Sequence, residues 1–164
     1  MCLYVDDFKR KKAKKDIKVL KVLFVTTDIT NIENRVYESP IHKTLWKLGQ
    51  TRTIAKSEEG HRNGFIVKKG YYHSYKADDK MERWVNALNP IFNRLVFEAT
   101  IPKGTWYYEG FQNDSFFRGY ASKSLRIDKL LDCEHNRRYM EHFKRIKRIE
   151  VMKDKDYRVL FGPK

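Results

Sequence analysis

The stretch from Ala99 to Ile127 constrains the fold of this chain most strongly. It contains two runs with strand character, at 105–109 and from 120 onward, and the turn Pro102-Lys103-Gly104 precedes the first of them. Glycine gives the backbone freedom at such turns, while aromatic and cationic side chains crowd the strand-like runs. The stretch therefore predicts strands joined by short connections, with aromatic and basic side chains carried on the same sheet.

Apolar runs and helical spacing predict the remaining elements. Strands are expected at 17–27, 51–56, 71–75, 94–100, 105–109 and 120–130, loops at 57–64 and 110–119, and a hairpin at 149–161. Asp78 is a candidate N-cap for an amphipathic helix over about 79–89, and a basic amphipathic helix is expected over about 134–148. We expect an α+β fold: a mixed or antiparallel sheet with one central amphipathic helix and a C-terminal basic helix.

Charge is concentrated at the two ends of the chain. The 164 residues suit one domain, and they carry 35 Lys and Arg against 21 Asp and Glu, a formal net charge of +14. Residues 1–15 hold six positive and two negative charges, and residues 135–164 hold ten and four. We expect a basic flexible arm at 1–16 and a single α+β domain at 17–164. A surface of this kind attracts polyanions, of which nucleic acid is the commonest, although lysine-rich composition can also serve solubility alone.

Several functional classes find no support in the sequence. Cys2 and Cys133 have no metal-ligand spacing, and the five histidines are scattered, so no metal site and no cofactor are expected. The apolar runs are too short to span a bilayer and no signal peptide is recognisable, so we expect a cytoplasmic protein without membrane contact. Nucleotide-binding glycine motifs and a nucleophile elbow are missing, and the sequence favours a binding protein over an enzyme.

Aromatic and cationic residues interleave in the manner of a surface that stacks bases and holds phosphates. The candidate ligand-binding residues are Tyr71, His73, Tyr75, Lys103, Trp106, Tyr107, Arg118, Ser122 and Lys123. The candidates for electrostatic contact with nucleic acid are Lys11, Lys12, Lys14, Lys15, Arg137, Arg138, Lys144 and Arg145.

Two of these candidates have plain structural alternatives. His73 lies between tyrosines and a serine, where it can donate to a phosphate or shuttle a proton, but the same neighbours suit a histidine hydrogen-bonded inside a tyrosine-lined sheet. Lys103 offers charge in a glycine turn that an anion can approach, yet an exposed lysine in such a turn needs no ligand. Strand alternation predicts that Tyr71, His73 and Tyr75 share one face of their strand, with Tyr72 and Ser74 on the other.

The order of several short motifs resembles a group of small uncharacterised bacteriophage and prophage proteins. These motifs are Gly70-Tyr71-Tyr72-His73-Ser74-Tyr75, Ile101-Pro102-Lys103-Gly104 and Tyr120-Ala121-Ser122. The group carries G-F-H-S-F, I-P-K-G and Y-A-S segments in that order, and this chain departs from the first with Tyr72 and Tyr75 in place of the phenylalanines. The resemblance covers roughly 40–127 and implies an accessory role in a bacterial host. The order of elements is also similar to that of the ADP-ribosyltransferase fold, although Ser122 and Ser124 stand where that fold has its catalytic glutamate.

We therefore expect a phage-type accessory protein that binds a nucleotide, a nucleotide-derived signal or nucleic acid, in a role such as countering a host defence. One alternative is an inhibitor that covers a host protein. Another is an ADP-ribosyltransferase-like enzyme or a degenerate relative of one. A homo-oligomer is compatible with each of these readings.

Overall fold

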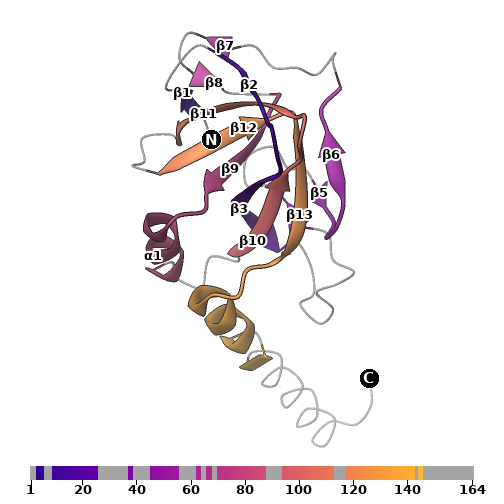
Figure 1. Cartoon of the computed structure of the whole chain (residues 1–164). Coiled ribbons are helices and arrows are strands. Elements are labelled where there is room, and N and C mark those ends of the chain that lie inside the picture. Colours follow the sequence, from indigo (N-terminus) through magenta and orange to yellow (C-terminus); the bar gives the residue numbers. More distant parts are fainter. Residues whose placement is uncertain are drawn as a thin grey trace, which may run out of the picture.

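The structure is a computed structural model that describes residues 3–5, 9–25, 37–38, 45–55, 62–63, 66–67, 70–87, 94–112, 117–142 and 144–145. Thirteen strands of these residues form one antiparallel sheet (Figure 1). The strands are β1 (Leu3–Val5), β2 (Lys11–Lys12), β3 (Ile17–Val25), β4 (Tyr37–Glu38), β5 (Leu45–Trp46), β6 (Thr51–Thr53), β7 (Arg62–Asn63), β8 (Ile66–Val67), β9 (Tyr72–Lys76), β10 (Arg94–Ile101), β11 (Trp106–Gln112), β12 (Arg118–Ser122) and β13 (Ser124–Leu130).

The strand order is β6-β13-β10-β3-β9-β12-β11-β1-β8-β7, with β2 also paired to β11 and β4 paired to both β3 and β5. Two helices accompany the sheet in the described chain, namely α1 (Asp79–Ala87) and a C-terminal helix at residues 134–142, with 144–145 also helical. Figure 1 shows both helices at the end of the molecule opposite to β1 and β2. The expected α+β architecture is confirmed, and the sheet pairing is antiparallel throughout the described strands.

The main core lies on one face of β3, where Val19 and Leu23 point to the same side by alternation. The core is completed by residues of β10, β12, β13 and the C-terminal helix: Leu95, Phe97, Ala99, Ile101, Tyr120, Leu125, Ile127 and Tyr139. Trp46 is buried in this core, as predicted, and meets the ring of Tyr72 edge-on with the centroids 5.0 Å apart. Buried apolar side chains of this kind supply most of the free energy that holds such a sheet together.

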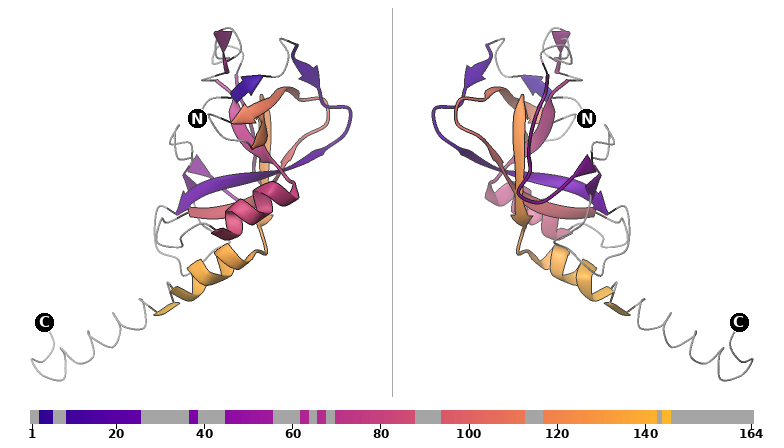
Figure 2. Two further views of the ribbon diagram at one scale, coloured as in Figure 1. Left: turned by 90° about the vertical axis from the view of Figure 1, so that its left-hand side faces the viewer. Right: turned by 90° about the vertical axis from the view of Figure 1, so that its right-hand side faces the viewer.

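Helix α1 covers the opposite face of the sheet. Met81 and Val85 pack against Leu20, Val22 and Val96, which alternate away from the main core on β3 and β10. The Oδ1 atom of Asp78 accepts a hydrogen bond from the backbone N–H of Met81 at 2.9 Å, so the predicted N-cap is confirmed. Figure 2 shows α1 against the sheet and the C-terminal helix extending away from it.

The N-terminal residues differ from the flexible arm that their charge predicts. Leu3 and Val5 are buried with Tyr71 and Ala121, and β1 pairs with both β11 and β8. Leu3 and Val5 alternate with the exposed Tyr4, and their burial and the strand pairing hold this short strand against the sheet. The basic run then continues along the sheet as β2.

The strands around residue 115 are longer than predicted, and the single strand expected at 120–130 is divided. β11 continues to Gln112 and β12 begins at Arg118, so much of the expected loop at 110–119 is strand. Lys123 separates β12 from β13 because β12 pairs with β9 and β11, whereas β13 pairs with β10 and β6. Its backbone N–H donates to the carbonyl of Trp106 at 3.0 Å, and its carbonyl accepts from the N–H of Ile54 at 2.9 Å.

β7 occupies part of the expected loop at 57–64. The predicted hairpin at 149–161, the ends of both predicted helices, Cys2, His42 and His61 lie outside the described residues.

Candidate functional site

β2 holds the basic run of the N-terminal segment against β11. Lys12 lies opposite Trp106 and Lys11 lies opposite Tyr107 in the antiparallel register. The Cζ atom of Arg10 is 4.7 Å from the centroid of the Trp106 ring, and the Nζ atom of Lys12 is 5.8 Å from it. Both cations therefore lie within cation–π range of one exposed indole. We call Arg10, Lys12 and Trp106 the Trp106 group.

A second group lies further along β11. Tyr4, Phe111 and Arg118 are cross-strand neighbours on β1, β11 and β12. The Cζ atom of Arg118 is 5.1 Å from the centroid of the Phe111 ring. We call these three residues the Phe111 group. Because Trp106 and Phe111 are separated by an odd number of positions in one strand, the two groups face opposite sides of β11.

Glu109 forms ion pairs with a lysine of β2 and with an arginine of β12, on the side of β11 that carries the Phe111 group. Its carboxylate pairs with the Nζ atom of Lys11 at 3.2 Å and with the Nη2 atom of Arg118 at 3.6 Å. The Lys11 and Arg118 side chains remain 40% and 36% exposed, so the carboxylate orients two cations that still reach solvent. One acid between two bases leaves a net positive charge beside the Phe111 ring.

The large hydrophobic side chains that are exposed in the described residues all belong to these two groups. Tyr4 is 38%, Trp106 38% and Phe111 41% exposed. Trp106 lies beside Arg10 and Lys12, and Phe111 lies beside Arg118. Tyr4 lies directly opposite Phe111. An exposed aromatic with an adjacent cation is the composition of surfaces that bind bases and phosphates together.

Other predicted ligand-binding residues are built into the interior. Tyr71, His73 and Ser122 are buried, with His73 only 3% exposed. Tyr71 meets Tyr108 edge-on at 5.5 Å, and the Oγ atom of Ser122 donates to the backbone carbonyl of Ser124 at 3.0 Å. A ligand on the surface does not reach these side chains.

The partly buried candidates divide between the two faces. Tyr75 packs with Trp84 and Phe117 beside α1, whereas Tyr72 packs into the main core, so the predicted alternation of this strand is confirmed. Tyr107 packs edge-on against Tyr120 at 5.7 Å. Burial, followed by the nearby Glu109 carboxylate, raises the pKa of Tyr120 to about 12.

Lys103 lies apart from the exposed rings of the two groups, whereas Lys123 is a cross-strand neighbour of Trp106, because its backbone N–H donates to the Trp106 carbonyl. Lys103 is exposed in the turn before β11, where Gly104 has a φ of +83° and the Lys103 N–H donates to the Oδ1 atom of Asp16 at 2.8 Å. Lys123 marks the division between β12 and β13. The structure thus brings together six candidates on or beside β11: Trp106, Tyr107, Lys11, Lys12, Arg118 and Lys123. It buries Tyr71, His73 and Ser122 and places Tyr75 and Lys103 elsewhere.

The basic residues of the C-terminal helix form a separate region. Arg137 pairs with Asp132 at 2.5 Å, Arg138 pairs with Glu134, and Lys144 and Arg145 are exposed. Because acidic partners neutralise two of the four cations, this helix is less basic than its arginine and lysine count indicates. Lys14 and Lys15 are exposed in the segment between β2 and β3.

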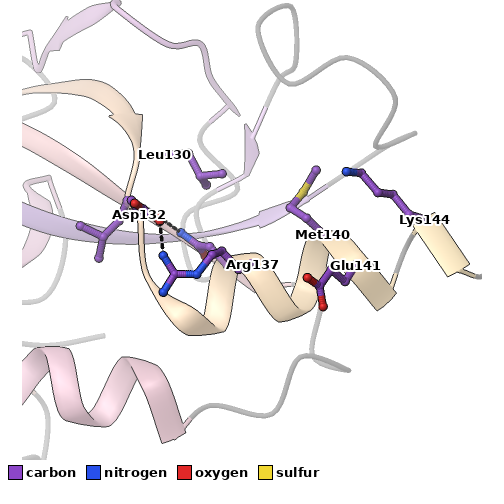
Figure 3. A pocket seen from close by; sticks show the side chains of 8 residues that line it. Leu130, Asp132, Arg137, Met140, Glu141 and Lys144 are labelled. Atoms are coloured by element: carbon purple, nitrogen blue, oxygen red, sulfur yellow. Dashed lines mark hydrogen bonds and ion pairs between the residues drawn. The ribbon is translucent and has the colours of Figure 1, made fainter.

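A pocket of about 340 Å³ lies beside the C-terminal helix (Figure 3). It is lined by Leu130, Leu131, Asp132, Asn136, Arg137, Met140, Glu141 and Lys144. Two acids balance two bases there, and Arg137 points to Asp132. The buried side chain of Asn136 accepts a hydrogen bond from the backbone N–H of Val96 at 3.0 Å and donates one to the backbone carbonyl of Val96 at 2.7 Å. These two bonds fix the C-terminal helix to β10. The charged residues that line the pocket therefore sum to zero, and the lining has no net positive charge to attract a polyanion.

The sequence interpretation missed Tyr4 and Arg10 and assigned Phe111 to a loop. Tyr4 alternates between Leu3 and Val5, which is a strand signal, but the run is too short to separate it from a disordered end. It also missed Lys21, which the structure buries between Val19 and Leu23 on the core side of β3. The sequence could have indicated this burial, because Lys21 alternates with the apolar residues Val19 and Leu23, which point toward the core.

No group of histidine, cysteine, aspartate and glutamate side chains suited to a metal ion occurs in the described part of the chain. Within the same residues, no helix is both long and apolar enough to cross a membrane. Comparison of the chain with protein-family models, with curated proteins and with solved structures found no match in any of the three.

Proposed function

We propose that this protein binds nucleic acid through the strands β2 and β11. The observation that carries the proposal is the fixed position of Arg10 and Lys12 over the exposed ring of Trp106. Cations held on a sheet lose less conformational entropy on binding a phosphate than cations on a free arm. The net charge of +14 adds long-range attraction to any polyanion.

The experiment compares two pairs of charge-removing substitutions that change the net charge equally. Arg10→Gln with Lys12→Gln, the β2 pair, alters β2 and the residue that precedes it, and Lys144→Gln with Arg145→Gln alters the C-terminal helix. Fluorescence anisotropy measures the Kd of a labelled single strand of about 12 nucleotides, as DNA and as RNA, between about 50 and 200 mM salt. We expect the β2 pair to weaken binding more, and to lower the magnitude of the slope of log K against log salt by about 1.4 for these single strands.

Equal losses from both pairs would mean that charge acts diffusely and that β2 is no site. The absence of binding at the lowest salt would refute the proposal altogether. Mononucleotides belong in the same titration, because a small nucleotide that binds independently of salt would identify a pocket instead of a phosphate-tracking surface.

A protein partner is the second candidate, since exposed tyrosine, tryptophan and arginine are enriched at protein interfaces. A stable complex with an acidic protein that persists in the presence of excess nucleic acid would favour it. The resemblance to phage proteins adds an accessory role in a bacterial host to either proposal, and expression of the protein in infected and uninfected cells tests that role.

A further inference from the structure

We infer that the nucleic acid is single-stranded and that its bases stack on Tyr4 and Phe111. This inference rests on the proposed function and adds the class of nucleic acid and the side chains that contact the bases. It concerns the Phe111 group, which lies on the side of β11 opposite to Trp106.

Tyr4 and Phe111 are exposed aromatic side chains on neighbouring strands. Tyr4 and Phe111 are register partners on adjacent antiparallel strands, so their Cβ atoms lie about 5 Å apart. Both side chains are more than a third exposed although they are large and apolar. Two neighbouring rings on a rigid sheet can each take a base, and they pay little entropy because the backbone already holds them.

Phosphate-binding groups flank these rings. Arg118 is the register partner of Phe111 on the other side and lies over its ring, and Lys11 reaches the same side of the sheet through Glu109. The order across β1, β11 and β12 is therefore aromatic, aromatic, cationic. A nucleotide strand with bases on Tyr4 and Phe111 places its phosphates toward Arg118 and Lys11.

A duplex does not match this arrangement. Its bases are stacked on one another and expose only their edges, so a planar ring on a sheet gains nothing from their faces. A single strand can turn its bases outward, and each base stacked on an aromatic side chain contributes enough to change affinity by about tenfold or more. The stacking part of this affinity depends little on the base, because every base has a π face.

The test substitutes Phe111 with residues that separate stacking from apolar contact. Phe111→Leu keeps an apolar side chain without a π face, whereas Phe111→Tyr and Phe111→Trp keep the ring. We expect Phe111→Leu to weaken binding of an oligothymidine of about 12 nucleotides by about tenfold, and the Tyr and Trp variants to bind it as wild type does. Binding of a duplex of equal length is expected to be weaker and to be the same for all four proteins.

The salt dependence supplies a second readout. Phe111→Leu should leave the slope of log K against log salt unchanged for oligothymidine, while Arg118→Gln should lower its magnitude by about 0.7. Circular dichroism and thermal unfolding of each variant check that it is folded. Lys129→Gln, on β13, is the matched control for the loss of one partly paired cation.

The outcomes separate this inference from the proposed function. If wild type binds duplex as tightly as single strand, or if Phe111→Leu binds oligothymidine as wild type does, stacking on Phe111 is refuted while the β2 site stands. If Phe111→Tyr fails to restore binding, the ring acts through the fold and the inference also fails. If no nucleic acid binds, both proposals fall together.

Discussion

Lys21 is a lysine in the interior of the sheet, where lysine side chains are rare. Its side chain is 6% exposed on the core side of β3, opposite Phe97, and its Nζ atom donates to the backbone carbonyl of His73 at 2.5 Å. Burial lowers the pKa of Lys21 from 10.5 to about 8. The charged form is therefore disfavoured in the folded protein.

The variant Lys21→Met is expected to be more stable than wild type at pH 7. Below pH 8 the wild type carries the full cost of a buried ammonium, on the order of 3 kcal/mol, whereas the variant loses one hydrogen bond worth about 1 kcal/mol. The unfolded chain binds more protons than the folded one between pH 8 and 10.5, so the wild type gains stability with rising pH in that window. The advantage of the variant should shrink there and disappear near pH 10.

Urea unfolding of both proteins at several pH values measures the difference between their free energies of unfolding. The contributions of titratable groups that both proteins share cancel in this difference. The matched control is Lys18→Met, which removes an exposed lysine from the same strand. A difference that stays constant from pH 7 to 10 would show that Lys21 does not carry the cost of burial.

At the scale of elements, β1 and β11 approach each other closely at one glycine. A Cβ atom at Gly110 would lie 1.8 Å from the backbone oxygen of Tyr4 and 2.7 Å from the Cα atom of Val5. These neighbours are backbone atoms, which cannot turn aside as a flexible side chain can. Gly110 thus permits the pairing that places Tyr4 beside Phe111.

Gly110→Ala is expected to separate β1 from β11 and to lower the free energy of unfolding by about 2 kcal/mol or more. Hydrogen exchange of the Leu3 and Val5 amides should rise, and stacking on Tyr4 should be lost. Gly104→Ala is the control: no atom lies within 4 Å of its added Cβ, and only its positive φ costs about 1 kcal/mol. A Gly110→Ala protein with wild-type exchange at β1 would contradict the close approach.

At the scale of the whole molecule, the basic residues around β2 and those of the C-terminal helix lie in two separate regions. The β2 region and the C-terminal helix occupy opposite ends of the fold (Figure 1), so a ligand at one does not complete its contacts with the other. The ion pairs Arg137–Asp132 and Arg138–Glu134 are exposed on both sides and contribute little each, as is usual for surface pairs, whereas the paired carboxylates of Glu109 and Asp128 are only 22% and 16% exposed. Self-repulsion of the net charge of +14 then acts against the compact state.

Salt is accordingly expected to stabilise the protein. Raising NaCl from about 50 to about 500 mM shortens the Debye length to a few ångströms and should add about 1 kcal/mol to the free energy of unfolding. Thermal unfolding across this range measures the effect, with the uncharged osmolyte sucrose as a comparison. A transition that moves to lower temperature with salt would mean that ion pairs outweigh the repulsion.

The sequence by itself determined the local elements. The apolar run of β3, the helical spacing and Asp78 N-cap of α1, the alternation of β9 and the turn at Gly104 were all readable, because each depends on neighbours a few residues away. The burial of Trp46 followed from its apolar surroundings.

Only the tertiary structure decided where the basic and aromatic residues meet. Lys11 and Glu109 are 98 positions apart in the chain, and the register of β1, β2 and β12 on β11 brings Tyr4, Phe111 and Arg118 side by side. The same pairing buries His73 and Ser122, which the motifs had favoured as ligand contacts. Register between distant strands depends on the summed packing of both faces, and no local pattern contains that sum.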